Sequence, residues 1–196
     1  MGDDNRGMTL VELMMSLAIL SIAGGLCLAN VLPETNATRA EAAARFLVAQ
    51  IRQARQEALQ RSTTVGVRFE PDGDRIRFRL YADGNGNGLR TRDVQDAIDL
   101  PLGVARSLED DFGATFGVSR ALPPIDAGGD RLEPGDSPIH VGSSRIVSFG
   151  ANGRGSSGTV YVRGRGDQQF AVRIFGQTGR VRLLQYRAAD AQWVER

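Results

Sequence analysis

A long, mostly apolar run near the amino end dominates the hydrophobic pattern of the chain. It extends from residue 8 to residue 32, and only Glu12 within it carries a charge. A helix over this run would measure roughly 35 Å, at about 1.5 Å per residue, which is enough to cross the hydrocarbon core of a bilayer. We therefore predict a transmembrane helix over 8–32, preceded by a short polar leader over 1–7.

A second helical pattern follows over 33–62. Apolar side chains recur there at spacings of three and four, while Arg and Gln fill the positions between them, which predicts an amphipathic helix. Thr38 and Glu41 have the spacing of a capping box, which would begin a new helix, whereas Pro33 would either break or kink a longer one. The apolar positions are Ala40, Ala44, Leu47, Ile51, Ala54 and Ala58.

The period changes to two after Ser62, which predicts a β-rich domain over 63–196. A hairpin is expected from Val65–Phe69 and Ile76–Leu80, because both segments alternate and the turn residues Pro71–Asp74 separate them. Four more strands are expected near the carboxyl end, joined by Gly-rich turns, so the fold class is α+β. These strands are 146–149, 159–163, 170–175 and 180–186.

Composition excludes several kinds of chemistry. All 24 basic residues are Arg, so the chain has no lysine for a P-loop or a Schiff base. Cys27 is the only cysteine, which rules out an internal disulfide and a Cys-based zinc site. His140 is the only histidine, and no Gly-x-Ser-x-Gly elbow accompanies it. We therefore expect a protein that is not an enzyme.

The start of the apolar run carries a specific motif. A polar leader ends at Gly7, Met8 opens the run, and Glu12 follows four residues later. An ionised carboxylate in hydrocarbon costs a few kcal/mol or more, so such an acid is a functional residue by default. The motif resembles the cleavage and methylation signature of type IV prepilins and type II secretion pseudopilins. The resemblance implies that a prepilin peptidase cuts after Gly7, that Met8 is methylated, and that Glu12 pairs with the amino end of a neighbouring subunit.

Further segments resemble the GspH/FimT group of minor pseudopilins and pilins. They are Ile51–Ala58 in the second helical pattern, the Gly-rich segment Ser148–Val160, and Gly179–Arg182 near the end. The resemblance implies a pilin-like fold, in which a long amino-terminal helix packs its second half on an antiparallel sheet. It also implies a minor structural subunit of a type II secretion pseudopilus or a type IV pilus, which supports protein secretion.

The same resemblance predicts the location of the protein and its partners. Arg6 favours a cytoplasmic amino end by the positive-inside rule, so the carboxyl-terminal domain is expected in the periplasm. The expected location is the inner membrane, with a single pass, before incorporation into a filament. The expected partners are the prepilin peptidase, other pseudopilins or pilins, the inner-membrane assembly platform and membrane lipid.

A Gly- and Asn-rich segment offers a candidate calcium loop. Asp83, Asn85 and Asn87 stand at ligand positions one, three and five, and Gly88 stands at position six, as in the first half of an EF-hand loop. Position twelve holds Val94 in place of an acid, so Asp93 or Asp96 would have to substitute for it through a different bend of the loop. The competing interpretation is a cluster of Asn-Gly turns that binds no metal, and no other cofactor is expected.

Arginines near the carboxyl end support an alternative function. Arg180 and Arg182 look like the positions that FimT-type minor pilins use to capture DNA during uptake, and arginines two apart on a strand share one face. The competing interpretation is that this motif is only a solvated strand and does not bind DNA. Arg163, Arg165 and Arg173 would add to the same positive surface. DNA is therefore an alternative partner.

Overall fold

The computed structural model describes residues 10–125 and 129–196, with the side chains of 23–37 excepted. The chain divides into two compact units, Met1–Asn36 and Ala37–Arg196. A single α-helix, α1 (Leu10–Arg61), belongs to both units. Its backbone is helical through Pro33 and Thr38, so the expectation of a new helix start at Thr38 is wrong. Thr and Glu at the spacing of a capping box are also tolerated inside a helix, since Glu is a good helix former and the propensity of Thr is only modestly unfavourable.

The described side chains of the first unit, from Leu10 to Ile22, are all exposed. They include large apolar side chains at consecutive positions, such as Leu13, Met14 and Met15, so no single polar stripe faces water. This segment therefore has an apolar surface that is not covered by other described residues.

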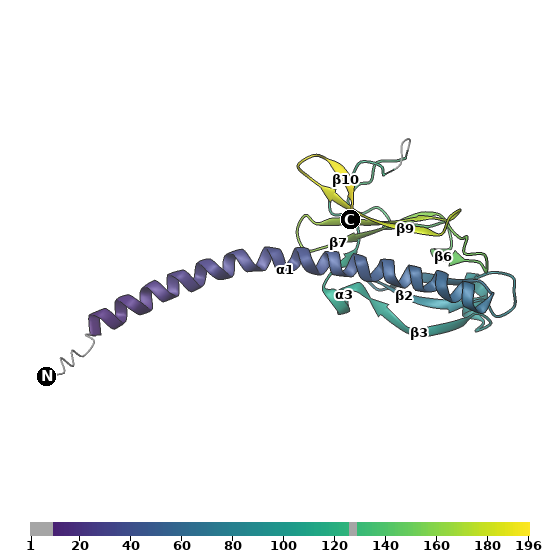
Figure 1. Cartoon of the computed structure of the whole chain (residues 1–196), viewed down its shortest axis with the longest axis horizontal. Coiled ribbons are helices and arrows are strands. Elements are labelled where there is room, and N and C mark those ends of the chain that lie inside the picture. The colour runs from purple at the N-terminus through teal and green to yellow at the C-terminus, as the bar shows by residue number, and fades with distance from the viewer. Residues whose placement is uncertain (1–9, 126–128) are drawn as a thin grey trace. The chain divides into compact units, whose positions relative to one another are not determined.

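The described residues of the second unit, 37–125 and 129–196, form two antiparallel sheets, the second half of α1 and two short helices (Figure 1). The first sheet has the strand order β3-β2-β1-β6, and the second has the order β10-β9-β8-β7-β4, with β5 paired to β7. The strands of the first sheet are β1 (Val65–Asp72), β2 (Arg75–Ala82), β3 (Leu100–Ser107) and β6 (Ile146–Phe149). Those of the second are β4 (Thr115–Phe116), β5 (Ile139–His140), β7 (Gly158–Arg163), β8 (Gln169–Phe175), β9 (Arg180–Arg187) and β10 (Gln192–Glu195). The short helices are α2 (Thr91–Gln95) and α3 (Leu108–Phe112).

The predicted hairpin is confirmed. Strands β1 and β2 pair in register from Val65 with Ala82 to Asp72 with Arg75, which leaves Gly73 and Asp74 as a two-residue turn. Gly73 has a φ of +60°, a left-handed conformation that glycine adopts without steric cost. The four carboxyl-terminal strands are found as β6 to β9, whereas β3, β4, β5 and β10 were not predicted.

The second half of α1 contributes its apolar face to a core that it shares with both sheets (Figure 1). All six predicted positions of this face are completely buried, which confirms the predicted amphipathic pattern. Most of them are alanines, and their small side chains let sheet residues approach the helix backbone closely. Leu47 and Ile51 are the largest of the six, and burying each contributes about 1.5–3 kcal/mol.

A smaller apolar cluster lies on the other side of the second sheet. Trp193 packs there against Tyr186 and Tyr161, with ring centroids 5.4 and 6.1 Å away. Its indole Nε1 donates a hydrogen bond to the carbonyl oxygen of Pro123 at 3.0 Å. Trp193 therefore ties β10 and the loop after β4 to the sheet.

Gln169 is the one completely buried amide side chain among the described residues. Its Nε2 donates to the carbonyl oxygens of Gly117 and Val162 at 3.0 and 3.2 Å, and its Oε1 accepts from the N–H of Ser119 at 2.9 Å. Because every polar atom of the amide has a partner, Gln169 can hold the loop after β4 against β7 and β8 without a burial penalty.

Candidate functional site

Glu12 lies in the first turn of α1, where the partial positive charge of the helix amino end favours a carboxylate. Its neighbours Val11 and Leu13 are 65% and 50% exposed, so the acid belongs to the apolar surface described above. Gly7 and Met8, the other residues of the predicted processing motif, lie outside the described residues. The pairing expected between Glu12 and a neighbouring amino end thus stays a prediction.

The predicted transmembrane segment is described only in part. Its side chains from residue 23 to residue 32 lie outside the described set. In the part of the chain that the structure describes, none of the helices contains an apolar stretch of the length that a membrane span requires.

The candidate calcium loop is organised around a buried carboxylate. Asp83 Oδ1 accepts hydrogen bonds from the backbone N–H groups of Asn85 and Gly86 at 3.1 and 2.8 Å. Its Oδ2 accepts from the N–H of Gly88 at 2.7 Å. The loop therefore folds back on its own first acid, which explains why glycines alternate with Asn in this segment.

A second acid, Asp99, supports the loop and was not singled out from the sequence. It is completely buried, and its two oxygens accept from the N–H groups of Gly84 and Arg90, both at 3.2 Å. A Cβ at Gly84 would overlap the carbonyl oxygen of Ile98, so the close approach of the two chain segments requires glycine there. The only sequence signal for Asp99 is an isolated acid between two apolar residues.

The other proposed calcium ligands lie in the same loop, and they already form hydrogen bonds within it. Asp93 Oδ2 accepts from Asn85 Nδ2 at 3.4 Å, and Asn85 Oδ1 accepts from the N–H of Asn87 at 3.2 Å. Within 10–125 and 129–196, no group of three or more His, Cys, Asp or Glu side chains is placed to hold a metal ion. Calcium binding stays a prediction, which calorimetry on the purified chain with and without a chelator would test.

The register of β8 and β9 brings some of the candidate DNA-binding arginines together. Arg182 lies opposite Arg173, and their guanidinium carbons are 5.4 and 5.5 Å from the centre of the Phe175 ring. Arg182 Nε also lies 3.5 Å from Glu195 Oε1, and this carboxylate lowers the net positive charge of the surface around Phe175. Arg180 is exposed at the start of β9.

Two other arginines of the predicted surface are placed differently. Arg163 donates from Nε to the hydroxyl of Thr115 at 3.0 Å, at the far end of β7 from Arg173. Arg165 follows β7 in the turn before β8 and is exposed. The positive surface on the second sheet is thus centred on Arg173, Arg180 and Arg182.

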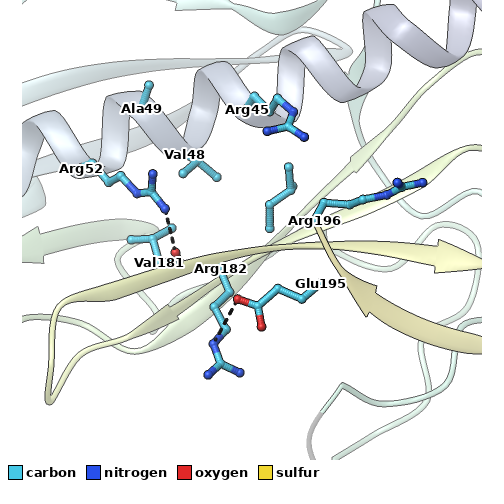
Figure 2. A pocket seen from close by; sticks show the side chains of 9 residues that line it. Arg45, Val48, Ala49, Arg52, Val181, Arg182, Glu195 and Arg196 are labelled. Atoms are coloured by element: carbon cyan, nitrogen blue, oxygen red, sulfur yellow. Dashed lines mark hydrogen bonds and ion pairs between the residues drawn. The ribbon is translucent and has the colours of Figure 1, made fainter.

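A cavity of about 440 Å³ lies between α1 and β9 (Figure 2). Arg45 and Arg52 line it from the helix, and Arg182, Glu195 and Arg196 line it from β9 and the end of the chain. The Arg182 guanidinium itself points away from α1 and lies near Glu195 (Figure 2). A second cavity of about 390 Å³ shares Arg52 and Glu195 with the first. The sequence pattern placed the helix arginines on a solvated face and did not indicate a groove.

The second cavity is also lined by Arg55, which connects the helix to both Gly-rich turns. Its Nε donates to the carbonyl oxygen of Gly153 at 3.1 Å. Gly179 has a φ of +65°, and a Cβ there would overlap Arg55 Nε and the Gly153 carbonyl oxygen. The glycines of the two turns therefore allow close packing on the helix, which gives these motifs a structural role.

The fold and the amino-terminal motif define a pilin-like protein. Residues 3–28 match the prokaryotic N-terminal methylation motif, and residues 43–179 match the family described as type II transport protein GspH. Because the second match spans more than half of the chain, the protein belongs to the GspH family.

Two individual proteins are also similar to the chain. The pilin-like protein PilA1 of Thermus thermophilus is 38% identical over 82 residues, which make up 42% of this chain and 51% of that protein. The chain thus matches about half of the length of this relative. The structure of the minor pseudopilin EpsH from the type 2 secretion system of Vibrio cholerae aligns with a TM-score of 0.46 and 16% identity, over 75% of this chain and 97% of that one.

Proposed function

We propose that this protein is a minor structural subunit of a type II secretion pseudopilus or a type IV pilus, where it supports protein secretion. In this proposal a prepilin peptidase removes residues 1–7, Met8 becomes the methylated amino end, and the amino-terminal helix drives assembly. The observation that carries the proposal is the uncovered apolar surface of residues 10–22, in which Glu12 is the single acid.

An apolar helix surface of this kind needs a partner. Side chains such as Leu10 and Leu20 are 76% and 74% exposed, which is unfavourable in water and favourable in lipid or between packed helices. Before assembly the inner membrane would supply the apolar surroundings. In a filament the helices of neighbouring subunits, delivered through the inner-membrane assembly platform, would replace the lipid.

Glu12 would set the register of that packing. A carboxylate in a medium of low dielectric must be paired or neutralised, because its desolvation penalty is several kcal/mol. The amino group of Met8 on a neighbouring subunit supplies a positive charge, and the attraction is stronger there than in water. A subunit in any other register would leave the acid unpaired.

We assign no reaction to the chain itself. His140, the only histidine, has its Nε2 at 2.7 Å from the carbonyl oxygen of Ser137, and its ring packs edge-on against Tyr161. These contacts give it a structural role. The chemistry of cleavage and methylation then belongs to the prepilin peptidase.

The proposal is tested by replacing Glu12 in cells that assemble the filament. We expect Glu12→Ala to reach the inner membrane normally but to be missing from sheared filaments, since an apolar change does not impair insertion and removes the register pairing. The matched control is Glu41→Ala, which removes an acid paired with Arg45 on the same helix. Normal incorporation of Glu12→Ala, or mass spectra in which assembled subunits still carry residues 1–7, would refute the proposal.

A second function, DNA binding during uptake, is favoured by the arginines around Phe175. Arg180 is exposed with no carboxylate partner in the described part of the chain, and guanidinium groups of this kind bind phosphates. A mobility shift on the purified chain at moderate salt tests this, and Arg180→Gln combined with Arg182→Gln should abolish the shift. The control is Arg75→Gln with Arg77→Gln, a pair equally spaced on β2 and already neutralised by acids. A shift that survives in the first variant excludes this site.

A further inference from the structure

One half of the β9 edge has no strand beside it. Strand β10 pairs with β9 only from Leu184 to Arg187, and the N–H of Arg196 adds one more hydrogen bond, to the carbonyl oxygen of Leu183 at 3.0 Å. From Arg180 to Arg182, no strand and no other hydrogen-bonded backbone in the described part of the chain lies on this side of β9. Such an edge presents backbone groups at the spacing that another strand would match.

A long side-chain hydrogen bond occupies this edge. Arg52 Nη2 donates to the carbonyl oxygen of Val181 at 3.3 Å, which is beyond the usual range for an N–H to carbonyl bond (Figure 2). A backbone N–H of an added strand could approach the same oxygen to about 2.9 Å. The Arg52 guanidinium would then be released to pair with an anionic group of the incoming chain.

Positive charge surrounds the edge. Arg52, Arg55 and Arg196 line the two adjoining cavities, and none of them has an Asp or Glu partner in the described part of the chain. Instead, Arg55 donates to a carbonyl oxygen and Arg196 to the amide oxygen of Gln185. Glu195 is the only acid that lines either cavity, and it lies near Arg182. Three guanidinium groups without a carboxylate partner favour an anionic occupant.

We propose that this groove binds an extended acidic peptide segment of a neighbouring subunit, which adds as a strand to the open edge of β9. The two cavities share Arg52, Val181 and Glu195, so they form a continuous groove along the edge rather than a closed pocket for a small molecule. Alternate side chains of an added strand would face the arginines. That the peptide comes from a neighbouring subunit rests on the proposed function, whereas the binding of an acidic strand does not.

The composition of the groove favours a peptide over a nucleic acid. Neither cavity has Phe, Tyr, Trp or His in its lining, so unpaired bases would find no ring on which to stack. The open edge, in contrast, offers hydrogen-bonding groups that a peptide backbone complements directly. The aromatic and positive surface around Phe175 belongs to the opposite face of β9, since Val181 and Leu183 face the core with α1 and Arg182 alternates with them.

The proposal is tested with the full chain in a non-ionic detergent and a fluorescent peptide of about eight residues that alternates Glu and Thr. We expect saturable binding that weakens about tenfold in Arg52→Gln and in Arg196→Gln, each of which removes one charge-assisted contact. The matched control is Arg92→Gln, because Arg92 is 88% exposed on α2 and lines neither cavity. Equal binding by all variants would overturn the proposal. Should Arg52→Gln fail to fold, Arg196→Gln alone carries the test.

Two further probes separate strand addition from other modes of binding. A Glu-Thr peptide with an N-methyl group at every residue keeps its charge but has no backbone N–H on either edge with which to pair with β9, so we expect its binding to be lost. Equal binding of this peptide would overturn strand addition. If an oligothymidylate binds and the acidic peptide does not, the occupant of the groove is a nucleic acid and the peptide proposal is wrong. These measurements do not depend on filament assembly, so a failure here is distinct from normal incorporation of Glu12→Ala.

Discussion

Arg55 on α1 donates a hydrogen bond from Nε to the carbonyl oxygen of Gly153, over 3.1 Å. The bond connects the long helix to the first Gly-rich turn, and Gly179 of the second turn lies against both groups. Gly155 and Gly176 join the two turns directly, through an N–H to carbonyl hydrogen bond of 2.8 Å. The helix and the two turns therefore form one packed unit whose stability can be tested residue by residue.

Replacing Arg55 by Met should destabilise the domain by about 1.5–3 kcal/mol, which is typical of a hydrogen bond from a charged donor. Met retains the apolar stem, so the change reports mainly on the lost bond to the Gly153 carbonyl. The measurement is urea unfolding followed by the fluorescence of Trp193, the only tryptophan. Arg61→Met is the control, since its exposed pair with Glu57 should contribute under about 0.5 kcal/mol. Equal losses in the two variants would contradict a specific role for Arg55.

Gly179→Ala should be more damaging, at about 2–5 kcal/mol. Its left-handed conformation penalises Ala by about 1–2 kcal/mol, and the new methyl group overpacks the contact with Arg55 at a cost of about 1–3 kcal/mol. Gly73→Ala is the matched control, because Gly73 has a similar φ of +60° but open space around it. Thermal unfolding of both variants tests the difference, and a Gly179→Ala protein as stable as Gly73→Ala would show that the turn can shift.

Gln169→Leu should lower the free energy of unfolding by about 1–3 kcal/mol, even though Leu is the more apolar residue. The change leaves the N–H of Ser119 and the carbonyl oxygen of Gly117 without their present partners. Gln192→Leu on exposed β10 is the control, and it should change stability by less than about 0.5 kcal/mol. An unchanged stability of Gln169→Leu would mean that water satisfies the released groups.

Asp167 should make a pH-dependent contribution to stability. A hydrogen bond from Arg120, together with its positive charge, lowers the pKa of this carboxyl below its ordinary value of about 3.9. Because the folded-state pKa is the lower one, the stabilisation is present above the ordinary value and is lost as the pH falls through the folded-state pKa. Unfolding curves of the native chain and Asp167→Asn should therefore differ at pH 7 and converge in strong acid. A difference that persists below both pKa values would contradict this account.

Some parts of the fold were predictable because each had a local cause. The hairpin of β1 and β2 follows from strict alternation on both sides of a turn segment, and the helix face from Ala40 to Ala58 follows from spacings of three and four. Strand β3 gave no such pattern, because seven of its eight positions are exposed or only partly buried and its pairing is long-range. Short helix α3 did carry signals, a side-chain cap from Ser107 and a left-handed Gly113, but these are too common to be decisive alone.

The candidate sites also differ in whether a local sequence pattern predicts them. Glu12 is evident from the sequence because a lone acid in an apolar run is rare, and this holds without any tertiary contact. The groove beside Arg52 could not be predicted, because it depends on where β10 ends relative to β9. Likewise, the pairing of Arg173 with Arg182 depends on the register of β8 and β9, which no local pattern determines.

The edge strand β3 has a consequence for solubility at high concentration. Arg79 Nε donates to the carbonyl oxygen of Gly103 at 2.8 Å, and the pairing with β2 shifts register between Phe78 and Leu80. An edge strand with an interrupted register is a poor template for uncontrolled growth of β-aggregates, even though Val104 is 71% exposed on it. Strand β3 is therefore a poor site for amyloid nucleation when the subunits are concentrated.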